Sequence, residues 1–121
     1  MKSHLLVESS NMHSFIIKKL LKKIGYKATI VKKTNDVVDI ILNNNNKYSI
    51  IWTDINFPGD DGLNLTKKLR EELHYKGVII GITGYCDIDT IQDCKKAGMD
   101  AILKKPVNLE ELKLYAKKYS T

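Results

Sequence analysis

Short, almost unbroken apolar runs alternate along this chain with longer segments of helical spacing. The clearest run is Gly77–Thr83, GVIIGIT, and a similar one, Tyr48–Thr53, ends at the acid Asp54. Strands buried on both faces show such continuous hydrophobicity, whereas half-exposed antiparallel strands alternate apolar and polar residues. Helical segments between the runs supply the crossovers that parallel strands require. The pattern therefore predicts an α/β fold with a parallel sheet covered on both faces.

The alternation repeats five times and predicts one doubly wound domain over residues 1–121, with five strands and five helices. We predict strands at His4–Val7, Ala28–Val31, Tyr48–Thr53, Gly77–Thr83 and Ala101–Leu103. The expected helices are Asn11–Ile24, Asp36–Leu42, Asp61–Leu73, Asp87–Ala97 and a last one from the N-cap Asn108 to Tyr119.

The first predicted helix has an apolar side and a basic side. Gly25 is a natural stop for this helix, and the four consecutive asparagines Asn43–Asn46 favour a loop after the second helix. We expect the buried side of the first helix to consist of Phe15, Ile16, Leu20, Leu21 and Ile24.

The net charge of +6 raises the question of nucleic-acid binding. Most of the charge comes from lysine pairs dispersed along the chain, and Arg70 is the only arginine for bidentate contacts. Direct nucleic-acid binding is therefore a minor alternative. No apolar run is long enough to enter a membrane, and Cys86 and Cys94 lack the spacing of a zinc site. We expect reduced thiols and a cytoplasmic location.

Polar residues end or follow four of the five predicted strands. They are Glu8, Asp54, Thr83 and Lys105. Sites in doubly wound sheets lie beyond the carboxyl ends of the strands, so these side chains should meet on one rim. Two carboxylates with a backbone carbonyl provide oxygen ligands for Mg²⁺, a hydroxyl and an ammonium can bind phosphoryl oxygens, and a carboxylate can act as the nucleophile. The rim therefore predicts phosphoryl chemistry.

Five stretches of the chain carry specific motifs: LLVESS, LLKKIGY, DINFPGDDGLNLTKKLR, VIIGITGY and AGMDAILKKPVNLEELK. Over nearly the whole chain, they resemble the receiver domain of two-component response regulators. The D-x-x-x-P-x-x-D-G block combined with Lys105-Pro106 is the most specific part. The pattern looks most similar to receivers attached to hybrid sensor histidine kinases. The resemblance implies a flavodoxin-like fold with strand order 2-1-3-4-5.

The resemblance also implies a role for each rim residue. Asp54 matches the phosphoacceptor, Thr83 the switch hydroxyl and Lys105 the site lysine, while Glu8, Asp54 and the Asn56 carbonyl match the Mg²⁺ ligands. The expected donor is a histidine kinase or a histidine phosphotransfer protein. The signal is expected to leave through the surface around Asp87–Lys118, toward a downstream protein or a tethered domain. Such a domain is a phosphoacceptor and not an enzyme.

Two positions depart from the family pattern. Ser9 replaces the second acid of the usual pair after the first strand, which predicts weaker Mg²⁺ binding. Ile102 stands where the family usually has an aromatic switch residue, although Tyr85 offers another aromatic nearby. The alternative is therefore a degenerate receiver that binds proteins with weak or no phosphorylation. Flavin binding is a third hypothesis, but the chain lacks a glycine-rich phosphate loop after the first strand.

Overall fold

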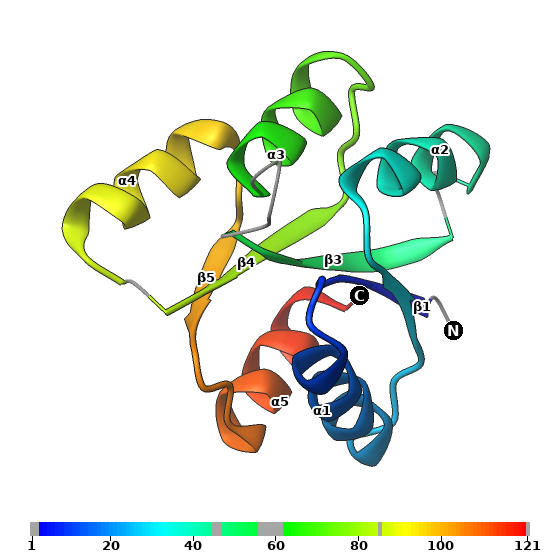
Figure 1. The fold of residues 1–121 in the computed structure, drawn as a ribbon, viewed down its shortest axis with the longest axis vertical. Coiled ribbons are helices and arrows are strands. Elements are labelled where there is room, and N and C mark those ends of the chain that lie inside the picture. The colour runs from blue at the N-terminus through cyan, green and yellow to red at the C-terminus, as the bar shows by residue number, and fades with distance from the viewer. Residues whose placement is uncertain (1–2, 45–46, 56–61, 85, 121) are drawn as a thin grey trace.

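The computed structural model describes residues 3–44, 47–55, 62–84 and 86–120. These residues form a five-stranded parallel sheet in the order β2-β1-β3-β4-β5, which confirms the predicted fold class and strand order (Figure 1). The strands are β1 Ser3–Val7, β2 Ala28–Val31, β3 Tyr48–Asp54, β4 Val78–Thr83 and β5 Ala101–Lys104. The helices are α1 Asn11–Lys23, α2 Thr34–Asn44, α3 Gly62–Glu71, α4 Ile88–Ala97 and α5 Leu109–Tyr119.

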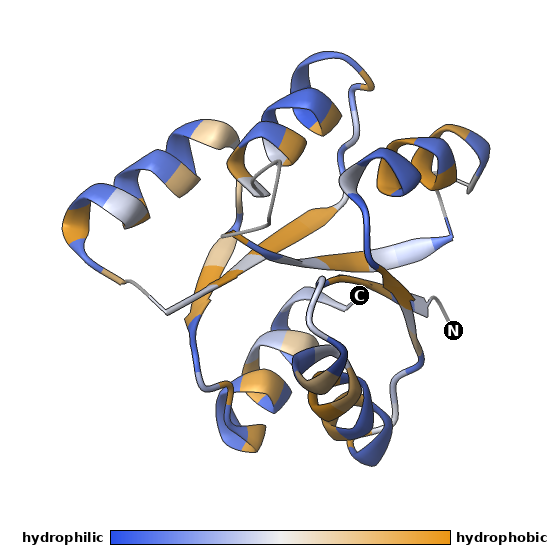
Figure 2. Cartoon of the chain, in the orientation of Figure 1, coloured by the Kyte–Doolittle hydropathy of each residue, from blue (hydrophilic) through white to orange (hydrophobic). Residues whose placement is uncertain are grey.

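Helices cover both faces of the sheet, α1 and α5 on one side and α2, α3 and α4 on the other (Figure 1). Each face has its own apolar cluster. Ile17 of α1 and Leu112 of α5 pack on one face, and Val37 of α2 and Leu69 of α3 pack on the opposite face. Both faces of the central strands are therefore buried, and Figure 2 shows these strands as predominantly hydrophobic. This double burial explains the continuous apolar runs.

The predicted buried side of α1 is partly wrong. Phe15 is 59% exposed and Ile16 is 45% exposed. The residues that face the sheet are Ser14, Ile17 and Leu21, whose i, i+3, i+7 spacing forms a single stripe. The helix has more apolar residues than the positions in this buried stripe, so Phe15 and Ile16 are left exposed to solvent. Leu20 and Ile24 lie beside the buried cluster, as expected.

Caps explain where several helices begin and end. The Ser10 side chain accepts the His13 amide at the start of α1, and Asp87 accepts the Thr90 amide at the start of α4. The predicted N-cap Asn108 is confirmed by its 2.8 Å contact with the Glu111 amide. The prediction for α2 ended too early: α2 continues to Asn44, and the Asn43 amide side chain donates to the Asp39 carbonyl at 2.9 Å.

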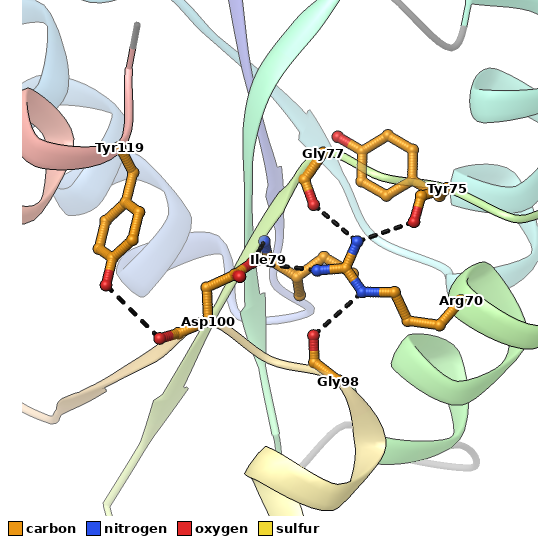
Figure 3. A network of polar contacts seen from close by, with 7 residues as sticks. All are labelled: Arg70, Tyr75, Gly77, Ile79, Gly98, Asp100 and Tyr119. Carbon is orange, nitrogen blue, oxygen red and sulfur yellow. Dashed lines mark hydrogen bonds and ion pairs between the residues drawn. The ribbon is translucent and has the colours of Figure 1, made fainter.

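The single arginine joins three segments of the chain by hydrogen bonds near the start of β4 (Figure 3). Arg70 of α3 donates to the carbonyls of Tyr75, Gly77 and Gly98 at 2.7–3.0 Å. It also forms an ion pair with Asp100 at 3.0 Å, and the same Asp100 oxygen accepts the Ile79 amide at 2.9 Å. One guanidinium thus joins the end of α3, the entry into β4 and the turn between α4 and β5.

His4, at the start of β1, is completely buried and hydrogen-bonded through both ring nitrogens. Its Nδ1 accepts from Trp52 Nε1 at 3.0 Å, and its Nε2 lies 2.9 Å from Ser120 Oγ. Because an indole N–H only donates, Nδ1 carries no proton and Nε2 donates to Ser120. Burial lowers the pKa of His4 from 6.5 to about 4, so the ring is neutral at physiological pH.

Within the described ranges, none of the helices has the length and apolar character needed to cross a membrane.

Candidate functional site

The four polar residues at the strand ends lie on the same rim of the sheet. Glu8 follows β1, and Asp54 and Thr83 are the last residues of β3 and β4. Asp54 pairs in register with Ile82, and Thr83 pairs with Lys104, one residue before Lys105. The rim predicted from the sequence therefore exists, with β1, β3, β4 and β5 each contributing one residue.

Lys105 lies between the two acids. Its Nζ is 3.3 Å from Asp54 Oδ1 and 3.6 Å from Glu8 Oε2. Glu8 and Asp54 are only 1% and 4% exposed, whereas Lys105 is partly open to solvent. Two carboxylates buried side by side repel each other, and the shared ammonium offsets that repulsion. The geometry therefore couples the charges of these three residues.

Glu8 is held in place by two hydrogen bonds, one to the neighbouring strand β2 and one from the start of the loop before α1. Its amide donates to the Val31 carbonyl of β2 at 3.0 Å, and its Oε1 accepts the Ser10 amide at 3.1 Å. The other oxygen, Oε2, is buried without a hydrogen bond among the described residues, and its one close cation is Lys105. Glu8 therefore retains an acceptor that faces the rim.

The ends of β4 and β5 are tied together at the site. The Lys105 amide donates to the Thr83 carbonyl at 2.7 Å, which fixes the lysine relative to the strand that carries the hydroxyl. The Lys105–Pro106 peptide is cis. Lys104, the neighbouring lysine, is exposed, as expected for a solvated surface residue.

Gly62 supports Asp54 in a way that the sequence interpretation missed. A Cβ atom at this position would lie 2.5 Å from the Asp54 carbonyl oxygen and 3.1 Å from the Ile55 Cα. The Gly62 amide also donates to the Ile55 carbonyl at 3.0 Å. The first residue of α3 therefore packs directly against the phosphoacceptor candidate's backbone. The D-G pair in the loop motif was the available signal for this contact.

At the position where the receiver pattern usually has an aromatic switch residue, this chain has a half-buried aliphatic side chain, Ile102. Ile102 pairs with Gly81 and packs beside the cluster under α2, α3 and α4. With Cys86 and Met99 it lines a shallow groove of about 190 Å³ between α4 and β5. Tyr85, the proposed alternative aromatic, and Asn56, the proposed carbonyl ligand, lie outside the described residues.

The carboxylate oxygens at the rim provide some of the ligands that a hard divalent cation requires. Glu8 and Asp54 present buried carboxylate oxygens to one point, and Glu8 Oε2 lacks a hydrogen bond there. Mg²⁺ often binds through one or two carboxylates and keeps several waters. Across the described part of the chain, no three His, Cys, Asp or Glu residues converge as a metal cluster. The two acids are therefore compatible with Mg²⁺ but do not enclose it.

These observations define the class of the protein. It is a doubly wound α/β domain with an acid pair, a hydroxyl and a lysine at the carboxyl rim of its sheet. A family model described as the response regulator receiver domain matches residues 5–117. The chain belongs to this family and is a receiver domain of two-component signalling, as its motifs predicted.

Its relatives include sensor kinases and small receivers. The chain is 30% identical over 113 residues to the osmosensing histidine protein kinase SLN1 of Saccharomyces cerevisiae, and 32% identical over 119 residues to the sensor histidine kinase RcsC of Escherichia coli. These matches cover 90% and 94% of this chain but only 9% and 12% of the kinases. The chain thus spans about a tenth of the length of these relatives.

Solved structures of receivers share the fold over nearly the whole chain. Vibrio cholerae chemotaxis protein CheY4 has a TM-score of 0.88 at 22% identity, with 98% of both chains covered. A CheY-like receiver from Methanospirillum hungatei has a TM-score of 0.84 at 26% identity, covering 98% of this chain and 92% of the other.

Proposed function

We propose that this receiver domain accepts a phosphoryl group on Asp54 from a phosphohistidine donor. The observation that carries the proposal is the buried Asp54 carboxylate at a strand end, 3.3 Å from the Lys105 ammonium and on the same rim as Glu8 and Thr83. This arrangement supplies a nucleophile paired with a cation, and a hydroxyl at the end of the neighbouring strand. We describe the domain as a phosphoacceptor and not as an enzyme acting on a separate substrate.

In the proposed reaction, an Asp54 carboxylate oxygen attacks the phosphorus of the donor. A new O–P bond forms while the N–P bond of the phosphoimidazole breaks, and its electron pair returns to the ring nitrogen, which takes up a proton. The product is an acyl phosphate on Asp54. Lys105 then pairs with a phosphoryl oxygen in place of the bare carboxylate, and the Thr83 hydroxyl donates to another.

Mg²⁺ is the proposed cofactor, and Glu8, Asp54 and the Asn56 carbonyl would hold it. When bound, it offsets the negative charge of the phosphoryl oxygens. Ser9 provides a hydroxyl where relatives of this type usually place a second acid, so we expect this chain to bind Mg²⁺ weakly.

Incubation with Mg²⁺ and acetyl phosphate tests the proposal without a protein donor. Intact mass spectrometry should show a phosphoryl adduct on the wild-type domain and none on Asp54→Asn. Beryllofluoride with Mg²⁺ should shift the amide resonances of Asp54, Thr83 and Lys105 in the wild type alone. No adduct and no shift at high Mg²⁺ would exclude the working-receiver function.

The alternative function is a degenerate receiver that binds proteins but is phosphorylated weakly or not at all. Two observations favour it: Ser9 in the acidic loop and the aliphatic Ile102 on β5. This alternative predicts that Asp54→Asn leaves every partner interaction unchanged. A partner whose affinity depends on acetyl phosphate would contradict it.

The proposed donor is a histidine kinase or a histidine phosphotransfer protein. A groove of about 180 Å³ supports this choice, because it offers an apolar docking surface lined in part by Lys105, the lysine that pairs with Asp54. Met12 is 69% exposed at its edge. The groove is lined by Met12, His13, Ile16, Ile17, Lys105, Pro106 and Val107.

We place the output surface on α4, β5 and α5, where a downstream protein or a tethered domain would bind. Ile88 of α4 is 73% exposed and Leu114 of α5 is 64% exposed, which supports an apolar contact on each helix. The relatives suggest that such a domain works as part of a longer kinase. The free thiols Cys86 and Cys94 suit a reducing compartment, and we propose a cytoplasmic location.

A further inference from the structure

The basic residues are dispersed along the chain, but its net positive charge comes from one continuous segment. Residues 9–35 contain seven of the 20 basic residues and none of the 14 acidic ones. The rest of the chain is therefore nearly balanced in charge. In the sequence these lysines appear as ordinary dispersed pairs, but the segment folds as a unit of α1 and β2, the edge strand of the sheet.

The fold gathers five of these lysines along a groove between α1 and β2. One hollow of about 640 Å³ is lined by Lys18, Lys19, Lys22 and Lys32, with Phe15 and Ile30. A second hollow of about 430 Å³ shares Lys18 and Lys22 and adds Lys27. The two hollows are therefore continuous, with lysines from both α1 and the β2 side. We call them together the α1–β2 groove.

The groove lysines are not neutralised by neighbouring acids. Every ion pair among the described residues involves Arg70 or Lys105, so none reaches the groove. Lys32 donates to the Asn11 side chain, a neutral acceptor, and the Lys19 ammonium lies 5.1 Å from the Phe15 ring centroid. The positive potential of the groove is thus open to a binding partner.

We propose that the α1–β2 groove docks an extended segment rich in Asp and Glu on a partner protein. Carboxylates spaced along such a segment can pair with lysines on both walls of the groove, and its apolar side chains can contact Phe15, which is 59% exposed. The groove runs beside the open edge of the sheet, where an extended polypeptide also finds backbone groups to pair with.

A protein segment suits this groove better than the other polyanions. The groove contains no arginine for bidentate phosphate contacts, and the ring of Phe15 is already covered on one side by Lys19, which hinders base stacking. A bilayer surface is flat, so it contacts lysines on a convex face more easily than lysines that line both sides of a hollow. A second copy of this chain would place lysines against lysines.

This proposal does not rest on phosphorylation of Asp54. Glu8, Asp54, Thr83 and Lys105 do not line the groove, so docking and phosphoryl transfer can be changed separately. Asp54→Asn should therefore bind an acidic segment as well as the wild type does.

The test uses a fluorescent glutamate-rich peptide as the probe and fluorescence anisotropy as the readout. The double variant Lys18→Glu/Lys22→Glu should weaken binding roughly tenfold, since each reversal replaces attraction with repulsion. The matched control is Lys113→Glu/Lys117→Glu, which makes the same charge change at the same helical spacing on α5. It should weaken binding by less than about twofold. If charge reversal impairs folding, Lys18→Gln/Lys22→Gln replaces it, with a smaller loss expected.

Two outcomes would overturn the proposal. Equal losses from the α1 and α5 variants would mean general attraction to a basic protein, with no docking groove. The other outcome is that an oligothymidylate or phosphatidylserine vesicles bind more tightly than the peptide, and that the α1 variant loses this binding. This result would assign the groove to nucleic acid or to membrane. In the supporting outcome, the peptide shifts amide resonances between Phe15 and Lys32 and leaves those of Asp54 and Lys105 unchanged.

Discussion

At the scale of single residues, two adjacent lysines at the end of β5 have different environments. Lys104 is exposed, while Lys105 forms ion pairs with both buried acids of the rim. Lys104 is the last residue of β5, whereas Lys105 follows the strand and is held at the rim by the hydrogen bond from its amide to the Thr83 carbonyl. The pair therefore offers a matched comparison for the charge of the site.

Lys105→Met should lower the free energy of unfolding by about 1–3 kcal/mol, because it leaves two buried carboxylates without their shared cation. The control Lys104→Met should change it by less than about 0.5 kcal/mol. Urea unfolding monitored by circular dichroism measures both. Equal stability of the two variants would contradict the proposed charge coupling. Added Mg²⁺ should stabilise Lys105→Met more than the wild type, since the cation replaces the ammonium.

Ser9→Asp should tighten Mg²⁺ binding roughly tenfold, because it adds a hard anionic ligand beside Glu8. Ser10→Asp is the matched control: it adds the same charge one residue later and keeps a good N-cap for α1. Isothermal titration calorimetry with MgCl₂ measures the affinity. Similar gains from both variants would assign the effect to general electrostatics and not to a metal ligand.

Sequence reasoning predicted that four polar residues would lie on one rim of the sheet, because strand ends are visible in the hydrophobic pattern. Glu8, Asp54, Thr83 and Lys105 each follow or end an apolar run, and topology brings such ends together. The hydrogen bonds of His4 were not predictable in this way. They depend on Trp52 and Ser120, which are far apart in sequence and meet His4 only in the folded core.

At the scale of elements, the start of α3 depends on a close backbone approach to β3. Gly62→Ala should lower the free energy of unfolding by about 1–3 kcal/mol, because the new methyl group would overlap the Asp54 carbonyl. Gly84→Ala is the control, since a Cβ there meets nothing within 4 Å. Urea unfolding again provides the measurement. A Gly62→Ala variant as stable as Gly84→Ala would mean that the junction relaxes freely.

Element boundaries were predictable where a cap was present and less so elsewhere. Asn108 is the N-cap of α5 as predicted, and α4 ends at the predicted Ala97, with Gly98 as its C-cap. The orientation of α1 was not predictable from periodicity, because its apolar residues exceed one stripe and several faces satisfy the pattern. Only packing against the sheet selected Ile17 over Phe15.

At the scale of the whole molecule, His4 makes stability depend on pH. Its pKa is about 4 in the folded protein and near 6.5 in the unfolded chain, so the unfolded state binds more protons between these values. The stabilisation is therefore complete above pH 6.5 and is lost as the pH falls toward 4. The midpoint of thermal unfolding should fall by roughly 5–10 °C across this window.

His4→Gln should remove most of that pH dependence while lowering stability at neutral pH. The exposed His13→Gln variant serves as the control and should keep the wild-type slope. Differential scanning calorimetry at several pH values between 4 and 7 separates the variants. A slope in His4→Gln as steep as in the wild type would show that other groups cause the acid sensitivity.

The contact between His4 and Ser120 also decides where attached polypeptide would emerge. It joins the start of β1 to the end of α5, so both ends of the described chain lie close together near the amino ends of the strands (Figure 1). The rim that carries Asp54 lies at the opposite, carboxyl ends. A linker at either end would depart from the far side and leave the approach to Asp54 clear. A short loop joining the two ends should also permit circular permutation, with new termini opened in a surface turn.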